Sequence, residues 1–254
     1  MCTVTVNRTA TQLLVTMNRD ESRMRGAELP PSVNCEGQFQ WLGPRDVQSG
    51  GTWIAVNNHG VVACLLNGYL PEVKHPPSVN VPRSRGGIVP WLMAQGSADA
   101  MREALAATFD PRAFASFTVV VADCSGVFEA NWRGKDGLQF TQHETAWTMF
   151  TSSSWNTAEV IAWRYRAFAE WMTNGAVFDG DVPSLHMLQP DGLAEWSPLM
   201  DRDRSTTHSL TQVVISNSDT NAAMRYWPRS AINARGQAVV ARIGLHAVTS
   251  LSHD

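Results

Sequence analysis

The sequence lacks the features that would place the protein in a membrane or on nucleic acid. Its 254 residues include 20 lysines and arginines and 23 aspartates and glutamates, with no basic stripe, so nucleic acid is not an expected partner. No apolar run approaches the roughly 18 residues of a membrane span. The start, MCTVTVNRTATQ, has no basic segment followed by an apolar one. We therefore expect a cytoplasmic protein without an integral membrane segment.

Cysteine is also scarce, and its spacing argues against the common cysteine sites. Cys2, Cys35, Cys64 and Cys124 form no C-x-x-C pair, so a zinc knuckle or a redox pair is not expected. Phosphate-loop, dinucleotide-binding, zinc-protease and nucleophile-elbow motifs are absent, and the seven histidines show no ligand spacing. We expect no metal and no organic cofactor, and we interpret the last three cysteines as ordinary buried thiols.

The composition and the pattern of elements indicate one α/β domain over residues 1–254. Apolar residues make up 44% of the chain and charged residues 17%, which is typical of a globular protein. Turn signals such as Asn58-His59-Gly60 separate β-rich runs, and such hairpins exclude a purely parallel sheet. Two antiparallel sheets packed together, with helices outside, would bury all the apolar faces.

Hairpins and helices alternate in the predicted order of elements. The predicted strands cover residues 2–6, 12–17, 53–57, 61–66, 117–123, 127–132, 146–151, 208–217 and 222–227. The predicted helices cover residues 85–95, 98–107, 157–173 and part of 183–195. Ser97 and Asn156 are placed to cap the second and third helices. Residues 27–50, rich in proline, glycine and polar side chains, are expected to form a loop. The apolar face of the third helix carries Val160, Trp163, Ala167, Phe168 and Trp171.

The chemistry that the sequence suggests centres on Cys2. Loss of Met1 would leave a thiol and a free α-amine on one residue, and an α-amine has a pKa of about 7.7–8.0. Such an amine can take the proton from its own thiol and later return it to a leaving amine. The alternative is that Cys2 is a structural cysteine on an edge strand.

A polar cluster, Asn18-Arg19-Asp20-Glu21, ends the strand that is predicted to pair with the first one. The hairpin would return this cluster to the chain start. There, Arg19 would lower the pKa of the Cys2 thiol, and Asp20 would hold the α-amine as ammonium. The alternative is a solvated cluster whose charges neutralise one another.

Three stretches of the sequence resemble the NRDE family, which includes the transport and Golgi organisation protein two relatives. They are MCT, LLVTMNRDESRMR and LGPRDVQSGGTWIAVNNHGVVACLLNGY. The named motif stands at 18–21 and GGTW at 50–53, and the likeness continues thinly at 84–89 and 203–215. That family is similar to N-terminal nucleophile hydrolases of the choloylglycine hydrolase and penicillin V acylase type. The resemblance therefore implies a four-layer αββα sandwich.

The resemblance also implies a set of site residues. Cys2 matches the nucleophile, and Arg19 and Asp20 match an arginine and an aspartate beside it. Asn67 matches an asparagine whose amide helps to form the oxyanion hole. Arg204 resembles a late arginine that lines the site. Ordinary interpretations stay open for the last two, because Asn67 could simply end a strand and Arg204 could be a surface charge.

One departure from the acylases concerns Ser152, which stands nearest the position of a second asparagine in those enzymes. The serine hydroxyl is a shorter and less directional donor than an amide.

Two main functions stay open. The first is an N-terminal cysteine amidohydrolase that cleaves a linear amide C–N bond. The second, which the resemblance also implies, is a carrier of haem, lipid or acyl-CoA on an inherited hydrolase scaffold. A structural partner protein is a third possibility. Both main functions require a small-molecule substrate or ligand.

Overall fold

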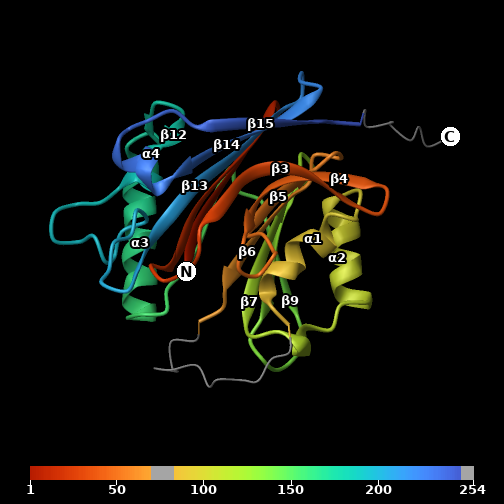
Figure 1. Cartoon of the computed structure of the whole chain (residues 1–254), viewed down its shortest axis with the longest axis horizontal. Coiled ribbons are helices and arrows are strands. Elements are labelled where there is room, and N and C mark those ends of the chain that lie inside the picture. The colour runs from red at the N-terminus through yellow and green to blue at the C-terminus, as the bar shows by residue number, and fades with distance from the viewer. Residues whose placement is uncertain (70–82, 247–254) are drawn as a thin grey trace.

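Two antiparallel sheets lie face to face, with helices on their outer sides (Figure 1). The structure is a computed structural model and describes residues 1–69 and 83–246. The first sheet contains, in spatial order, β10 (Trp147–Ser152), β1 (Cys2–Arg8), β2 (Gln12–Ser22), β13 (Ser205–Ser216), β14 (Asn221–Pro228) and β15 (Val239–Gly244). The second contains β3 (Glu28–Glu36), β4 (Phe39–Asp46), β5 (Ile54–Asn57), β6 (Val62–Asn67), β7 (Phe117–Ala122), β8 (Val127–Trp132) and β9 (Gln139–His143). The predicted αββα sandwich is confirmed.

The helices cover the outer faces of the sheets. On the second sheet lie α1 (Ile88–Leu92), which follows the short 3₁₀ turn η1 (Arg85–Gly87), and α2 (Ala98–Ala107). On the first sheet lie α3 (Thr157–Thr173) and α4 (Arg229–Asn233). Smaller elements are the 3₁₀ turns η2 (Pro111–Ala113) and η3 (Ser184–Met187) and the two-stranded β11 (Phe178–Asp179) and β12 (Val182–Pro183). No helix in the described ranges is long and apolar enough to cross a membrane.

The main core fills the space between the two sheets. Alternate residues of β1 and β2 point inward, because successive side chains of a strand lie on opposite faces. This core includes Val4, Val6, Val15 and Met17 from the first sheet and Ile54, Val62, Cys64 and Leu66 from the second. Each fully buried aliphatic side chain of this kind contributes about 1.5–3 kcal/mol. The core holds β1 rigidly, and with it Cys2 at the start of the strand.

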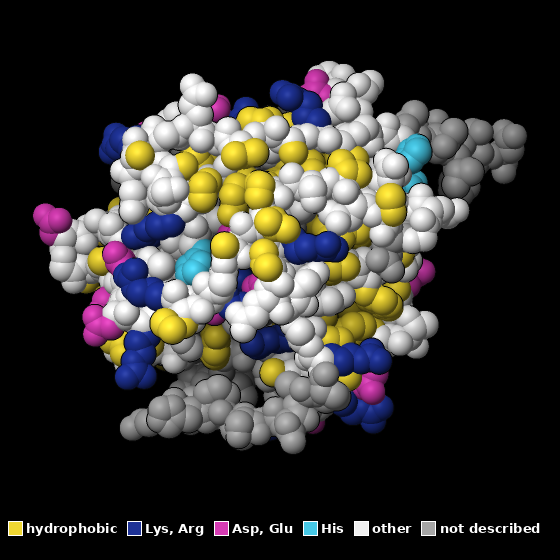
Figure 2. All heavy atoms as spheres, in the orientation of Figure 1, with side chains coloured by type: hydrophobic (Ala, Val, Ile, Leu, Met, Phe, Trp, Pro, Cys, Tyr) yellow, Lys and Arg dark blue, Asp and Glu magenta, His cyan; other side chains and the backbone are white. Residues whose placement is uncertain are grey.

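The predicted loop at residues 27–50 is wrong, because β3 and β4 occupy most of it. Prolines normally argue against a strand because they cannot donate to the ladder. Here Pro30 and Pro31 are tolerated because β3 is an edge strand, and its register with β4 shifts between Leu29 and Ser32. Two other edge strands, β9 and β15, were also not predicted. Their side chains are mostly exposed, and Figure 2 shows apolar side chains on the surface around β15.

The predicted helices α2 and α3 are confirmed, whereas the predicted cap at Asn156 and the predicted helix within 183–195 are not. Ser97 caps α2 by accepting a hydrogen bond from the Ala100 N–H at 3.1 Å, and α3 has its predicted bounds. Asn156, in contrast, makes no capping hydrogen bond because its backbone is left-handed, with φ at 41°. Only the short η3 forms within 183–195.

Candidate active site

Cys2 lies in the middle of a row of three side chains that runs across β2, β1 and β10. The strand register places Arg19 opposite Cys2 on one side and Ser152 opposite it on the other. Directly paired residues lie on the same face of a sheet, and Cys2 belongs to the core between the sheets. The Ser152 hydroxyl is buried and has no hydrogen-bond partner among the described residues. This row therefore brings three of the predicted site residues together.

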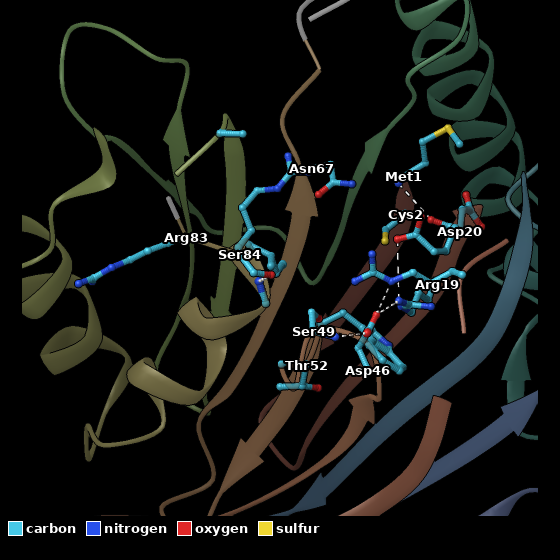
Figure 3. A pocket seen from close by; sticks show the side chains of 18 residues that line it. Met1, Cys2, Arg19, Asp20, Asp46, Ser49, Thr52, Asn67, Arg83 and Ser84 are labelled. Atoms are coloured by element: carbon cyan, nitrogen blue, oxygen red, sulfur yellow. Dashed lines mark hydrogen bonds and ion pairs between the residues drawn. The ribbon is translucent and has the colours of Figure 1, made fainter. Parts of the chain in front are cut away.

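Cys2 and Arg19 of this row line a cavity of about 280 Å³ (Figure 3). Cys2, Arg19 and Asp20 line it from the first sheet, and Asn67 faces them from the end of β6. The segments 18–21, 50–53, 65–69 and 84–87, which stand far apart in the sequence, each contribute to the lining. Four of the six predicted site residues thus share this cavity.

Two glycines bring the segments 50–53 and 84–87 together. A Cβ atom on Gly51 would lie only 2.4 Å from the carbonyl carbon of Gly86, a distance that no side chain tolerates. The Thr52 N–H donates to the Gly86 carbonyl at 3.1 Å across the same contact. The glycine in GGTW is therefore required for the close approach of η1 to the cavity.

Arg19 is held by two carboxylates and an aromatic ring. Its guanidinium donates to Glu28 and, at 2.6 Å, to Asp46, and it lies 4.4 Å from the ring centre of Trp53. Glu28 also accepts hydrogen bonds from Ser209 and Tyr226. The positive charge of Arg19 is therefore largely neutralised by acidic groups other than the thiol.

The pKa of the Cys2 thiol is raised from its ordinary value while Met1 is present, although the Arg19 charge acts in the expected direction and lowers it. Burial is the main cause, because a thiolate in a low-dielectric site loses its hydration. The N-terminal ammonium, the Asp20 backbone N–H and the Arg19 charge each act in the opposite direction, but burial outweighs them.

Met1 closes one end of the cavity and is itself buried. Its α-amine donates to the Asp20 carbonyl at 3.1 Å, and its own carbonyl accepts from the Asp20 N–H at 3.0 Å. Burial opposes the charged form of this amine. The negative charges around it, Asp20 and Glu21 among them, outweigh burial and raise its pKa.

The side chain of Met1 faces polar groups. Its sulfur lies 2.9 Å from Nη1 of Arg202 and 3.2 Å from the Ser154 hydroxyl. A thioether is a weak acceptor, so it satisfies these donors poorly. Burial lowers the pKa of Arg202 to about 10.

The carboxylate of Asp20 points to the other face of β2, away from the thiol row. One oxygen accepts from the Thr207 hydroxyl at 2.7 Å, and the other lies 3.6 Å from Nη2 of Arg164 and has no hydrogen bond. Burial raises the pKa of this carboxyl, although the Arg164 charge opposes the rise. The α-amine of Met1 is held by the Asp20 backbone carbonyl, and the expectation that the Asp20 carboxylate holds a free α-amine of Cys2 stays a prediction.

Arg164, on α3, is a site residue that the sequence analysis did not identify. Its side chain is fully buried and donates to the Thr3 hydroxyl at 3.0 Å and to the Trp196 and Ser197 carbonyls at 2.8 Å. A signal existed, because position 164 falls on the apolar stripe of the helix, four residues after Val160. A charged residue on such a stripe indicates a buried polar contact.

Asn18 and His186 form a second buried pair behind the row. The Asn18 amide donates to the His186 carbonyl at 3.0 Å, and its oxygen contacts Nδ1 of His186. Nε2 of the same ring lies 2.7 Å from the Thr5 hydroxyl. Burial lowers the pKa of His186 to about 3, so the ring is neutral at physiological pH and acts as a structural group.

Of the remaining predicted site residues, Asn67 lies at the cavity and Arg204 does not. Asn67 lines the cavity, and its Nδ2 donates to the Tyr69 hydroxyl at 3.1 Å. Arg204 is exposed and does not line the cavity, so its predicted place at the site is wrong. The arginine that does reach the chain start is Arg202, which also donates to the Ser153 hydroxyl at 3.2 Å.

Three solved structures share this fold at low sequence identity. A variant of the conjugated bile acid hydrolase from Clostridium perfringens matches with a TM-score of 0.53 and 12% identity, covering 99% of each chain. Penicillin V acylase from Agrobacterium tumefaciens matches with a TM-score of 0.52 and 12% identity, covering 96% of this chain and 86% of the other. The Caenorhabditis elegans N-acylethanolamine-hydrolyzing acid amidase ortholog matches with a TM-score of 0.53 and 13% identity, covering 94% and 100%. The chain thus shares its overall fold with these three proteins.

The sequence itself matches one protein family over most of its length. No curated protein matches the chain at a significant level. Residues 1–229 match the family described as Transport and Golgi organisation 2. This match spans the cavity-lining segments and Arg202, and it agrees with the resemblance carried by NRDE and GGTW. The chain belongs to the Transport and Golgi organisation 2 family.

Proposed function

We propose that the protein is an N-terminal cysteine amidohydrolase that cleaves a linear amide C–N bond. The observation that carries the proposal is the row of Arg19, Cys2 and Ser152, of which Cys2 and Arg19 line a cavity that Asn67 also lines. A nucleophile, polar groups and room for a small substrate are thereby brought together.

The proposed reaction starts when loss of Met1 frees the α-amine of Cys2. That amine accepts the thiol proton, and the thiolate attacks the amide carbonyl carbon. Asn67 and a backbone N–H hold the oxyanion that forms. The C–N bond then breaks, and the leaving amine takes the proton from the Cys2 ammonium. Water, deprotonated by the same amine, hydrolyses the thioester and releases the acid.

Two features around Met1 support its removal in this proposal. Arg202 and Ser154 donate to the thioether sulfur of Met1, which is a weak acceptor. If Met1 were removed, these donors would lose only weak hydrogen bonds and could bind water or substrate instead. One oxygen of Asp20 is buried without a hydrogen bond, and it lies on the residue whose carbonyl already binds the α-amine. The Cys2 ammonium would therefore find a counter-charge close by.

The test compares three forms of the chain on a panel of N-acyl amides and lactams. The forms are the chain that begins at Cys2, a chain with an uncleavable N-terminal extension, and the Cys2→Ala variant. Only the first form should turn over a substrate, because an amide nitrogen has no basic lone pair. All three should melt at similar temperatures. Equal turnover by the first two forms would refute N-terminal catalysis, and turnover by Cys2→Ala would refute the nucleophile.

The alternative function is a carrier of haem, lipid or acyl-CoA. The raised thiol pKa favours it, since a thiol that stays protonated does not suit an efficient hydrolase. A carrier should bind haem or acyl-CoA with an affinity that survives Cys2→Ala, as measured by absorbance and calorimetric titration. Binding of neither ligand below millimolar concentration would eliminate this function. The cytoplasmic location stays a prediction under both functions.

A further inference from the structure

Arg85, unlike Arg19 and Arg25 but like Arg83, lines the cavity without a carboxylate partner among the described residues. Arg19 and Arg25 both contact Asp46, so their charges are balanced. Arg83 points away from Cys2 (Figure 3). Arg85 forms no ion pair with any residue in the described ranges, although it lines the cavity. The guanidinium of Arg85 therefore has no ion-pair partner at the cavity wall among the described residues.

The backbone around Arg85 fixes its position. The close packing of Gly51 against Gly86 holds η1 at the cavity. Nη1 of Arg85 donates to the Ser116 carbonyl at 2.9 Å, and the same carbonyl accepts from the Gly68 N–H at 2.9 Å. This is the one hydrogen bond of the Arg85 side chain within the described residues. The remaining N–H groups of a guanidinium are then free to bind an anion in a fork geometry.

The electrostatic surroundings place Arg85 close to the reacting group. Burial lowers its pKa, while the negative charges of Tyr69, Glu21 and Cys2, when ionised, each oppose that shift. Arg85 and Cys2 also line the same cavity. The arginine thus lies in the same electrostatic environment as the thiol.

We propose that Arg85 binds an anionic group, a carboxylate or a phosphate, on the molecule that reacts with Cys2. The proposal rests on the amidohydrolase function above and narrows its substrates to amides that carry such a group beside the scissile bond. An anion would satisfy the free N–H groups of Arg85 and supply the missing counter-charge. It would also orient the carbonyl toward the sulfur.

Alkylation of Cys2 tests this selectivity without requiring amide hydrolysis. Iodoacetate and iodoacetamide have nearly the same size, and with each the thiolate displaces iodide, but only iodoacetate is anionic. The ratio of their rates is measured by peptide mass on the full chain that begins at Cys2. Cys124, which is exposed, serves as the internal reference. Arg166→Gln, an exposed arginine on α3, is the matched control variant.

The proposal predicts a higher iodoacetate preference at Cys2 than at Cys124. Arg85→Gln should lower that preference about fivefold, which is the size of one partly buried charge interaction. Arg85→Lys should retain most of it, and Arg166→Gln should leave it unchanged. An unchanged ratio in Arg85→Gln, or no preference at Cys2 in the wild-type chain, would overturn the proposal.

Competition in the wild-type chain gives a second measurement that does not depend on the folding of a variant. Succinate or inorganic phosphate should slow alkylation of Cys2 by iodoacetamide but not that of Cys124, and the stronger competitor identifies the preferred anion. If neither anion slows Cys2 at millimolar concentration, Arg85 binds no such group. Because no turnover is measured, these outcomes are independent of whether the chain hydrolyses amides.

Discussion

Strand β2 carries buried polar side chains on both faces near Cys2, and the two faces differ in how these groups are satisfied. On the face toward α3, Asn18 pairs with His186, and Asp20 contacts Thr207 and Arg164. Almost every donor there has a protein acceptor. Apart from one Asp20 carboxylate oxygen that has no hydrogen bond, this face is a closed network, and its effect is to fix the strand.

On the cavity face, the groups are satisfied less completely. Arg19 has two carboxylates, but the neighbouring Ser152 hydroxyl has no partner in the described structure, and the Cys2 thiol faces a cavity. A buried polar group without a partner costs free energy, and a protein retains such groups where they act on a ligand. The comparison predicts that substitutions on the α3 face lower the free energy of unfolding, whereas substitutions on the cavity face lower the rate of the proposed reaction.

The largest effect on stability is expected from Arg164→Ala. The change leaves Asp20 without its counter-charge and leaves the Trp196 and Ser197 carbonyls without their donor. We expect the free energy of unfolding to fall by about 3–5 kcal/mol, as for other broken buried ion pairs. Chemical denaturation measures it. Arg166→Ala, on the exposed side of the same helix, should change stability by less than about 0.5 kcal/mol. Similar values for the two variants would remove the distinction between the faces.

Acid should weaken the α3 face through His186. Its pKa is about 3 in the folded chain and about 6.5 when unfolded, so the unfolded state binds more protons between these values. Stability should therefore fall as the pH drops below 6.5, by up to about 1.4 kcal/mol per pH unit.

Other acidic groups also titrate in this window, so a variant is needed to isolate the histidine. His186→Gln should be less stable at neutral pH but should show a shallower decline between pH 6 and pH 4. Parallel denaturation profiles for the two proteins would mean that His186 is not held neutral by burial.

A smaller loss is expected from Asn18→Ala. This change removes two contacts with His186 and leaves buried polar atoms of the histidine without a partner. The expected loss is about 1–3 kcal/mol. In a double-mutant cycle with His186→Gln, the two losses should be clearly less than additive. Additive losses would show that the two side chains do not stabilise each other.

The smallest effect on stability is expected from Ser152→Ala. The hydroxyl has no partner to lose, so the unfolding free energy should change by less than about 0.5 kcal/mol. The proposed reaction, by contrast, should slow if this hydroxyl helps to hold the oxyanion. A variant that is much less stable, with unchanged turnover, would place Ser152 in the structural network.

Much of the site could be predicted from the first strand pair. Counting along the 2–6 and 12–17 hairpin brings Arg19 back to Cys2, because the register of a hairpin follows from its turn. The register of β10 could not be counted, since residues 9–146 lie between β1 and β10. The family resemblance supplied Ser152 and Asn67, and the fold then placed both near Cys2.

The errors have physical causes. Arg202 and Arg204 are two residues apart, so in an extended segment their side chains would point to the same side. The sequence alone therefore does not show which of the two arginines reaches the chain start. The isolated bridge between Asp201 and Thr206 decides it by folding the chain back on itself. The sequence indicated the charges near Cys2 but not how deeply its thiol is buried, because burial depends on the whole packed structure. The net rise of the thiol pKa could therefore not be predicted.

The central claim, that a free α-amine on Cys2 activates its thiol, is tested most directly by trapping the acyl-enzyme. The chain that begins at Cys2 and the chain with an uncleavable extension are mixed with one activated N-acyl amide, quenched in acid and analysed by peptide mass. The account predicts an acyl group on the Cys2 peptide of the first form alone. Equal acylation of both forms, or consumption of the amide with Cys2 unmodified, would contradict it.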